Sequence, residues 1–271
     1  PAVANLQIGS RQTEAKMKIA RYLPAGTPRY GIVEDGRLYQ AQGDLFTGLS
    51  KEAEVGAVDS ATLLPPVDPS KIAAIGLNYA AHVTENDPTR EVPTEPVIFM
   101  KPQSALLAHG GVIELPQGAN RIDHEAELCI VIGKTASRVS EADAPNYILG
   151  YTCGNDVSHR DFQRKDGQWV RAKGFDTFAP MGPVIETDLD VNQVAIQGRL
   201  NGEVKQSSNT SNMIFKPAFL VSFVSNVMTL NPGDVIMTGT PEGVSPMKPG
   251  DTIEVEIEGI GTLRNTTKAR D

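Results

Sequence analysis

Residues 126–132, within the segment HEAELCIVIG (124–133), are apolar at every position except Glu127. On a β-strand alternate side chains point to opposite faces, and here both faces carry apolar groups. The first face would hold Ala126, Leu128, Ile130 and Ile132, and the second Cys129 and Val131. A strand of this kind needs cover on both sides, so the pattern predicts a strand buried in the interior of the fold.

Two glutamates open this segment and would share its second face. Glu125 and Glu127 are two positions apart, so on a strand about 6–7 Å would separate them. At an effective dielectric constant of about 20, two carboxylates at that distance repel by roughly 2–3 kcal/mol, before any cost of desolvation. Either they lie at a frayed, solvated strand end, or a cation offsets their repulsion.

A second acidic segment provides a comparison within the chain. In IEVEIE (253–258) all the acids fall on one face and all the apolar residues on the other. A solvated outer face explains that pattern. It does not explain 124–133, where the acidic face continues into Cys129 and Val131, so a divalent cation is the stronger interpretation.

A hard cation such as Mg²⁺ or Mn²⁺ takes oxygen ligands and leaves positions for water and substrate, so a third acid is expected. Asp156 is the candidate, because it follows the strand-like residues 147–154 at a point where a side chain can reach a cleft. An equally weighted alternative is that Asp156 caps the next helix. Zinc is disfavoured, since the chain has no HExxH motif and no cysteine pair, although His124 stays open as a neighbour of the site.

Three further polar residues follow Asp156. Arg160 and Gln163 would share one face of a short helix, where Arg160 suits a carboxylate and Gln163 a carbonyl group. Lys173 adds a positive charge. Taken singly, each of them is better explained by a solvated helix and loop.

A candidate helix over residues 78–86, NYAAHVTEN, carries His82 and Glu85 three positions apart. A carboxylate beside an imidazole raises its basicity and fixes its orientation, as a general base requires. The proline-interrupted stretch 87–96 that follows has the composition of a lid. A surface ion pair on an ordinary helix is the alternative.

Residues 237–243, MTGTPEG, would present hydroxyl and backbone N–H groups at the end of a strand. The alternative is that these residues form a plain turn.

Composition narrows the classes of function. The chain has 271 residues and a net charge of −8, which disfavours nucleic acid and anionic membranes as partners. It has no apolar run of about 18 residues, so no transmembrane helix is expected. The two cysteines form no disulfide framework, which is typical of a cytoplasmic protein.

The chain divides into three predicted parts. Residues 1–16 lack the order of a secretion signal and are either a native leader or an added extension. Residues 17–66 read as short strands, with a hairpin turn at Asp35–Gly36, and form a small N-terminal domain. Residues 67–271 form the catalytic domain. Strands are expected at 71–76, 96–101, 122–133, 234–241 and 251–259, and helices at 78–86, 140–150 and 216–230.

Several ordered motifs resemble the fumarylacetoacetate hydrolase family from about residue 70 to the C-terminus. They are GLNYAAH, EPVIFMKP, DHEAEL, GYTCGNDVSHRDFQ, QWVRAKGFDTFAPMGP, NMIF and GDVIMTGTPEGV. The resemblance implies an α+β, mainly β fold: a β-roll catalytic domain with few helices behind a small β-rich N-terminal domain. It also implies a homodimer.

The resemblance assigns roles to residues of this chain. It implies Mg²⁺ or Mn²⁺ held by Glu125, Glu127 and Asp156. It further implies catalytic roles for His82, Glu85 and Lys173, and substrate-binding roles for Arg160, Gln163 and Thr240.

The function expected from this resemblance is metal-dependent hydrolysis of a C–C bond in short 2,4-dioxo acids such as acylpyruvates or fumarylpyruvate. The metal would stabilise a pyruvate enolate, and His82 with Glu85 would activate water. The same enolate chemistry serves oxaloacetate decarboxylation and the isomerisation of unsaturated oxo-diacids, which stay open as alternatives. A non-enzymatic metal-binding module is a remote alternative.

Overall fold

The computed structural model describes residues 16–85 and 87–271. The predicted leader therefore lies outside the described residues except for Lys16, as does Asn86 at the end of the predicted helix 78–86.

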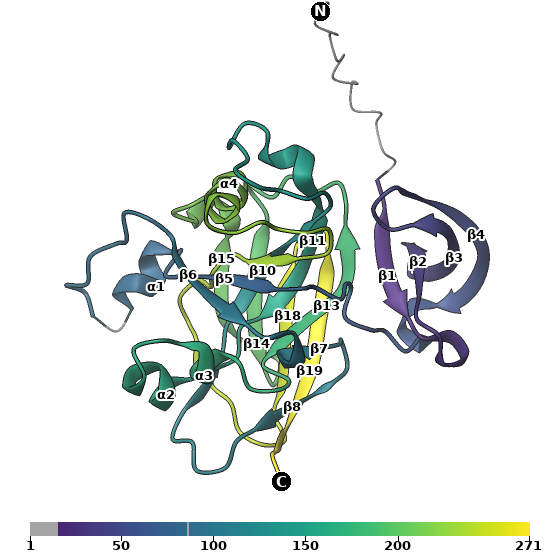
Figure 1. The fold of residues 1–271 in the computed structure, drawn as a ribbon. Coiled ribbons are helices and arrows are strands. Elements are labelled where there is room, and N and C mark those ends of the chain that lie inside the picture. Colours follow the sequence, from purple (N-terminus) through teal and green to yellow (C-terminus); the bar gives the residue numbers. More distant parts are fainter. Residues whose placement is uncertain (1–15, 86) are drawn as a thin grey trace, which may run out of the picture.

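Three sheets are present within the described residues (Figure 1). The largest has the strand order β4-β3-β2-β1-β13-β11-β10-β16-β5-β6, with β7 paired to β13. Its strands are β1 (Lys18–Tyr22), β2 (Arg29–Glu34), β3 (Arg37–Asp44), β4 (Gly48–Ala57), β5 (Ile72–Gly76), β6 (Val97–Lys101), β7 (Leu106–Leu107), β10 (Ala126–Ile132), β11 (Ile148–Asn155), β13 (Ala179–Glu186) and β16 (Val235–Met237).

Two smaller sheets complete the strand content of the described residues. The first, in the order β15-β14-β18-β19-β8, consists of β8 (Val112–Leu115), β14 (Ala195–Leu200), β15 (Glu203–Asn209), β18 (Thr252–Ile257) and β19 (Gly261–Ala269). The second, in the order β12-β9-β17, consists of β9 (Ile122–His124), β12 (Ser158–His159) and β17 (Ser245–Pro246).

Helices are few and short in the part of the chain that the structure describes. The α-helices are α1 (Ala80–Thr84), α2 (Arg160–Lys165), α3 (Val170–Lys173) and α4 (Pro217–Val227). The 3-10 helices are η1 (Pro24–Gly26), η2 (Val58–Ser60), η3 (Gln103–Ala105), η4 (Ala144–Tyr147) and η5 (Thr210–Asn212). The predicted mainly β fold is therefore confirmed. None of the described helices is long and apolar enough to cross a membrane.

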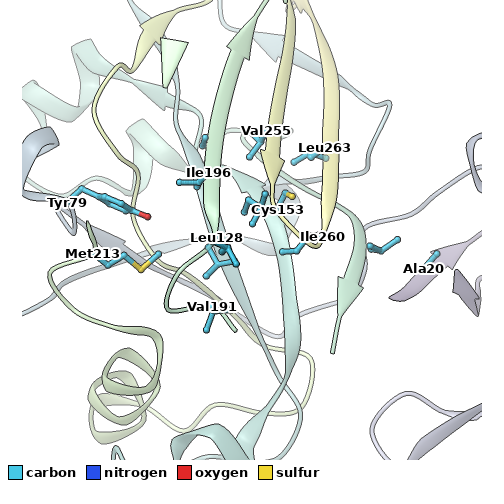
Figure 2. Packing of buried hydrophobic residues seen from close by; sticks show 14 of the residues in the cluster. Ala20, Tyr79, Leu128, Cys153, Val191, Ile196, Met213, Val255, Ile260 and Leu263 are labelled. Carbon is cyan, nitrogen blue, oxygen red and sulfur yellow. The ribbon is translucent and has the colours of Figure 1, made fainter. Parts of the chain in front are cut away.

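The strand β10 is buried at all seven positions, as its sequence predicts. Ala126 and Leu128 belong to a cluster with residues of β14 and β18, among them Ile196 and Val255 (Figure 2). Further along the same face, Ile130 and Ile132 pack with apolar residues of α4. Cys129 and Val131 lie on the opposite face, in a cluster with residues of β5, β13 and β16. Cover on both faces explains why this strand tolerates so few polar residues.

The acidic strand 253–258 behaves differently, as its alternation predicts. In β18, Ile253, Val255 and Ile257 are buried, with 1% of each exposed. Glu254 and Glu256 between them are partly exposed. The sheet containing β18 therefore packs through one face and leaves the other to solvent.

The N-terminal strands β1–β4 form an antiparallel, strongly curved ribbon that extends the large sheet (Figure 1). The predicted hairpin turn is present: Asp35 and Gly36 both have positive φ, at 47° and 74°, as a two-residue turn between β2 and β3 requires. Strand β1 pairs with β13, which lies beyond residue 66. The domain boundary near residue 66 stays a prediction.

The helix prediction for 140–150 is wrong. These residues form a turn, the 3-10 helix η4 and the start of β11. The Ser140 hydroxyl accepts the Asp143 backbone N–H and donates to the Asp143 carboxylate, a local arrangement that competes with helix formation. Ile148 then pairs with Ile132 of β10, so the sheet determines the conformation that follows.

The carboxylate of Asp234 connects the segment after residue 66 to the sheet. Its Oδ1 accepts the backbone N–H groups of Ser70 and Lys71, and its Oδ2 accepts that of Asn231. The Lys71 ammonium forms an ion pair with it. Burial disfavours its charge, but these hydrogen bonds and Lys71 more than compensate and hold the pKa of Asp234 below the ordinary value. Asp234 thereby fixes β5 beside β16.

Replacing Asp234 with Asn is expected to lower the free energy of unfolding by about 2–4 kcal/mol, since a buried charge-assisted network loses its anion. Because the folded pKa lies below the unfolded one, the contribution is present above the unfolded pKa and is lost as pH falls through the folded one. Urea unfolding near neutral and at acidic pH should thus show variant and wild type converging in acid. A constant difference would contradict this.

Candidate metal centre and active site

Three buried carboxylates converge at one end of the β10–β11 pair. Ligand atoms of Glu125, Glu127 and Asp156 all lie within 4.8 Å of one another. Glu127 is on β10, while Glu125 lies between β9 and β10, and Asp156 directly follows β11. The Asp156 N–H donates to the Glu125 carbonyl oxygen over 2.9 Å, so extension of the β10–β11 pairing brings the acids together.

The structure corrects one expectation about the three acids and decides between the alternatives for the glutamates and for Asp156. The acids do not lie on one continuous strand, because the strand is interrupted at Glu125, whose N–H donates to the Asn155 side chain. A frayed, solvated end is excluded, since Glu125 and Glu127 are only 3% and 1% exposed. Asp156 does not cap the next helix: the N-cap of α2 is His159.

Lys173 and Arg160 neutralise part of this acidic cluster. The Lys173 ammonium donates to Glu125 Oε2 over 2.8 Å and to Asp156 Oδ2 over 2.6 Å. The Arg160 guanidinium donates to Glu125 Oε1 over 2.6 Å and to Asp123 Oδ2 over 2.7 Å. Both residues come from the short helices after Asp156, and the structure brings them to the acids. Their predicted substrate-binding and catalytic roles stay predictions.

Lys101 is a site residue that sequence reasoning missed. Its ammonium is 1% exposed, and its three N–H groups donate to the carbonyl oxygens of Val157, Lys173 and Phe178. It also lies 2.7 Å from Asp156 Oδ1. In the sequence, Lys101 resembles an ordinary strand-end lysine after the apolar residues 97–100, and only the structure shows that it shares the buried face of β6 with Phe99.

The two glutamates have opposite pKa shifts. Burial disfavours the charge of Glu125, but Lys173, Arg160 and His82 hold its pKa well below the ordinary value. Burial, together with the charges of Asp156 and Glu125, raises the pKa of Glu127 well above the ordinary value. The protein's own cations thus stabilise the charge of Glu125, while that of Glu127 lacks comparable compensation.

This donor set fits Mg²⁺ or Mn²⁺. All three candidate ligands are carboxylates, which hard cations prefer. Asp156 Oδ1 is buried and forms an ion pair with the Lys101 ammonium over 2.7 Å, but one lone pair meets no N–H in hydrogen-bond geometry, since the N–H groups of Lys101 are directed to carbonyl oxygens. A divalent cation would use that lone pair and would also supply the positive charge that Glu127 lacks.

We expect Glu127→Gln to weaken Mn²⁺ binding by more than about 100-fold, since even loss of a ligand's outer-shell partner costs roughly 10–100-fold. In the wild type, affinity should rise with pH over the range in which Glu127 loses its proton, because the cation and the proton compete for it. Calorimetric titration of Mn²⁺ at several pH values measures both effects.

Glu254→Gln is the matched control, because it removes a partly exposed strand glutamate far from the cluster in sequence. Equal Mn²⁺ affinity of the Glu127 variant and this control would contradict a metal site at Glu127.

The helix α1 carries the predicted His82–Glu85 pair. His82 Nδ1 lies 3.0 Å from Glu85 Oε2, and Glu85 Oε1 accepts the Gly243 N–H over 2.8 Å. Burial disfavours the charge of Glu85, but the hydrogen bonds from His82 and Gly243 lower its pKa. The charge of His82 in turn lowers the pKa of Glu125, so the pair lies within electrostatic reach of the carboxylates.

A cavity of about 480 Å³ lies between α1 and α2. His82, Arg160, Gln163 and Trp169 line it. Arg160 Nη1 donates to Gln163 Oε1 over 2.8 Å, which fixes both side chains on one face of α2, as their spacing predicts. Arg160 also contacts Glu125, and so connects the cavity with the acidic cluster. In Figure 1, α1 and α2 lie on the side of the molecule opposite to the N-terminal strands.

Thr240 lies in the wall of the site with its hydroxyl already occupied. The hydroxyl donates to the Ala126 carbonyl oxygen over 2.8 Å and accepts from Gln206 over 2.7 Å. The neighbouring Gly239 N–H donates to Glu127 Oε2 over 2.8 Å. Thr240 therefore positions the loop against β10 here, and its predicted contact with substrate stays untested.

Two family models match different parts of the chain. Residues 71–268 match the model described as the fumarylacetoacetate (FAA) hydrolase C-terminal domain. Residues 17–66 match the model described as Rv2993c-like, N-terminal.

Individual relatives have several named activities. The chain is 41% identical to the mitochondrial oxaloacetate tautomerase fahd2 of Xenopus laevis, over 75% of this chain and 67% of that one. The crystal structure of 2-hydroxyhepta-2,4-diene-1,7-dioate isomerase from Mycobacterium marinum is similar with a TM-score of 0.86 and 40% identity, covering 93% and 98% of the two chains. Maleylpyruvate hydrolase from Sphingobium sp. SYK-6, solved with manganese(II) and pyruvate, has a TM-score of 0.78 and 29% identity, covering 94% and 100%.

Proposed function

The chain belongs to the fumarylacetoacetate hydrolase family, and we propose that it is a metal-dependent enzyme that forms and protonates the enolate of a short 2-oxo acid. One observation carries the proposal: His82, which is paired with Glu85, borders the same cavity as Arg160, which contacts the acidic cluster.

Glu125, Glu127 and Asp156 would hold Mg²⁺ or Mn²⁺. When bound, the cation would supply Lewis-acid stabilisation of the negative charge that develops on the 2-oxo acid. The manganese in the related maleylpyruvate hydrolase supports this assignment. Lys173 and Arg160 would balance the charge of the substrate carboxylate, with Gln163 donating a hydrogen bond beside them.

His82 would move the proton. Glu85 Oε2 accepts the hydrogen bond of Nδ1–H, which leaves Nε2 as the basic nitrogen of the neutral ring. Nε2 would take a proton from C3 of the 2-oxo acid and return it to either end of the enolate, which interconverts keto and enol forms. No other reactant is needed for this step.

Two reactions share this enolate. In keto–enol tautomerisation or isomerisation, only the proton moves, and the names of the tautomerase and isomerase relatives favour this outcome. In hydrolysis, Nε2 would deprotonate a water whose oxygen joins C4 of a 2,4-dioxo acid; the C3–C4 bond then breaks and C3 takes a proton. The related hydrolase favours that candidate.

The cytoplasmic location and the homodimer expected from the sequence stay predictions, as does decarboxylation of oxaloacetate.

His82→Ala is expected to lower the enzymatic rate by about 100-fold or more, because a positioned acid–base group contributes at least that much. Glu85→Gln should give a smaller loss, since the ring remains but Nδ1–H loses its charged acceptor. Two assays with Mg²⁺ and Mn²⁺ distinguish the reactions: ultraviolet absorbance follows enol-to-keto conversion of oxaloacetate, and pyruvate release follows acetylpyruvate hydrolysis.

His109→Ala is the control, because His109 lies outside this cavity and bonds the backbone of Arg264. Undiminished activity of the His82 variant, or of the wild type after chelation of divalent cations, would refute the mechanism. Absence of both reactions, with the metal still bound, would favour a non-enzymatic metal-binding module.

A further inference from the structure

Asn78 lies in the segment between β5 and α1, and 0% of the residue is exposed. Both N–H groups of its side chain are engaged, since Nδ2 donates to the carbonyl oxygens of Phe215 over 3.0 Å and of Thr238 over 2.7 Å. Its Oδ1 accepts the Phe215 N–H over 2.7 Å. One buried side chain thereby connects the start of α1 with the segment before α4 and with the loop after β16.

The backbone beside Asn78 adopts a conformation that needs such support. Leu77, which lines the cavity, has a φ of 61°, in the left-handed region that residues other than glycine rarely adopt. A conformation of this kind persists only where the surrounding contacts determine it. Asn78 provides several of them, because its own carbonyl oxygen also accepts the Ile214 N–H over 2.8 Å. These contacts hold the sharp turn from β5 into α1.

The position of Asn78 determines where α1 begins. His82 follows it by four residues, which is about one helical turn. The Val83 N–H closes the first turn by donating over 3.0 Å to the carbonyl oxygen of Tyr79, the residue directly after Asn78. Tyr79 also packs in the apolar cluster of Figure 2, but apolar contacts are non-directional. The hydrogen bonds of Asn78 therefore fix the direction in which α1, with His82, leaves the sheet.

The other end of this connection reaches the acidic cluster. The carbonyl group of Thr238 that Asn78 binds directly precedes Gly239, whose N–H donates to Glu127 Oε2 over 2.8 Å. This loop has bonds of its own to β10, since the N–H and the hydroxyl of Thr238 both donate to the Leu128 carbonyl oxygen, over 3.0 Å and 2.9 Å. Loss of the Asn78 side chain should thus leave Glu127 in place and release mainly α1.

We propose that Asn78 is a positioning residue, which fixes His82 relative to the acidic cluster. The inference rests on the proposed function, in which His82 moves the proton. Asn78 does not itself line the cavity, so it acts on the reaction through the backbone groups that it binds. Its side chain keeps Nε2 of His82 in the orientation that proton transfer needs.

Asn78→Ala is expected to lower kcat by about 10–100-fold, because a misplacement of about 1 Å can cost up to that much. The affinity for Mn²⁺ should change less than about twofold, since the loop retains its own bonds to β10. The ultraviolet and pyruvate-release assays measure kcat, and calorimetric titration measures the Mn²⁺ affinity. Asn78→Asp keeps the acceptor for the Phe215 N–H but has no N–H to donate; it serves if the alanine variant fails to fold, and should show the same loss of kcat.

A second readout needs no substrate. Hydrogen exchange of the Val83 N–H, measured by NMR, should become faster by about fivefold or more in Asn78→Ala, because the first turn of α1 opens more often without the hydrogen bonds of Asn78.

The double variant His82→Ala/Asn78→Ala separates positioning from a general loss of structure. Once the imidazole of His82 is absent, Asn78 has no base to position. The additional substitution should therefore lower the remaining rate less than about twofold. A double variant whose rate falls by the product of the two single effects would contradict the inference.

Asn265→Ala is the matched control. Asn265 is 2% exposed, and its Nδ2 likewise donates to two backbone carbonyl oxygens, those of Ala108 and Gly111, over 2.8 Å and 3.0 Å. It lies in β19, outside the cavity. Asn265→Ala should therefore lower resistance to urea as Asn78→Ala does, while kcat and the exchange of the Val83 N–H stay within about twofold of the wild type.

The outcomes for Asn78 and for the proposed function are distinguishable. An unchanged kcat, or an unchanged exchange of the Val83 N–H, in Asn78→Ala beside the expected loss in His82→Ala would overturn the positioning role alone. Undiminished activity of His82→Ala, or a wild type without activity in both assays, would overturn the proposed function together with it.

Discussion

The ion pairs of Lys173 with Glu125 and Asp156 are the interaction on which the site depends. Each buried charge left unpaired would cost several kcal/mol, so the acids can meet in the interior only because cations meet there too. Lys101 contributes twice: its ammonium lies beside Asp156, and it also holds the Lys173 carbonyl oxygen at the end of α3. The position of one lysine therefore depends on the other, and the position of Asp156 depends on both.

A single loop after β16 connects the two halves of the site. Gly239 donates its N–H to Glu127 in the acidic cluster, and Gly243 donates its N–H to Glu85 beside His82. Both glycines have positive φ, 97° and 93°, and a Cβ would lie 2.7 Å from Asn78 Cβ or 2.0 Å from the Lys205 carbonyl oxygen. Only glycine fits these two positions, so the loop sequence determines the distance between the acidic cluster and the base.

Local patterns in the sequence predicted the parts of this structure that local forces determine. The apolar run of β10, the alternation in β18, the Asp35–Gly36 turn and the His82–Glu85 spacing all appear as expected. The grouping of the nine candidate residues into one site was predicted from the ordered family motifs, because no sequence periodicity relates Glu125 to Asp156. Lys101, the interruption at Glu125 and the Asp123–Arg160 pair depend on contacts between distant segments, which leave no local pattern.

The carboxylate of Glu85 links α1 to the loop after β16. Its two oxygens engage different partners, His82 on its own helix and Gly243 on the loop beside the acidic cluster. The hydrogen bonds from His82 and Gly243 both lower the pKa of Glu85, so its ionised state depends on the contact between α1 and this loop. The carboxylate that orients His82 is therefore held by the same loop that donates to Glu127 of the acidic cluster.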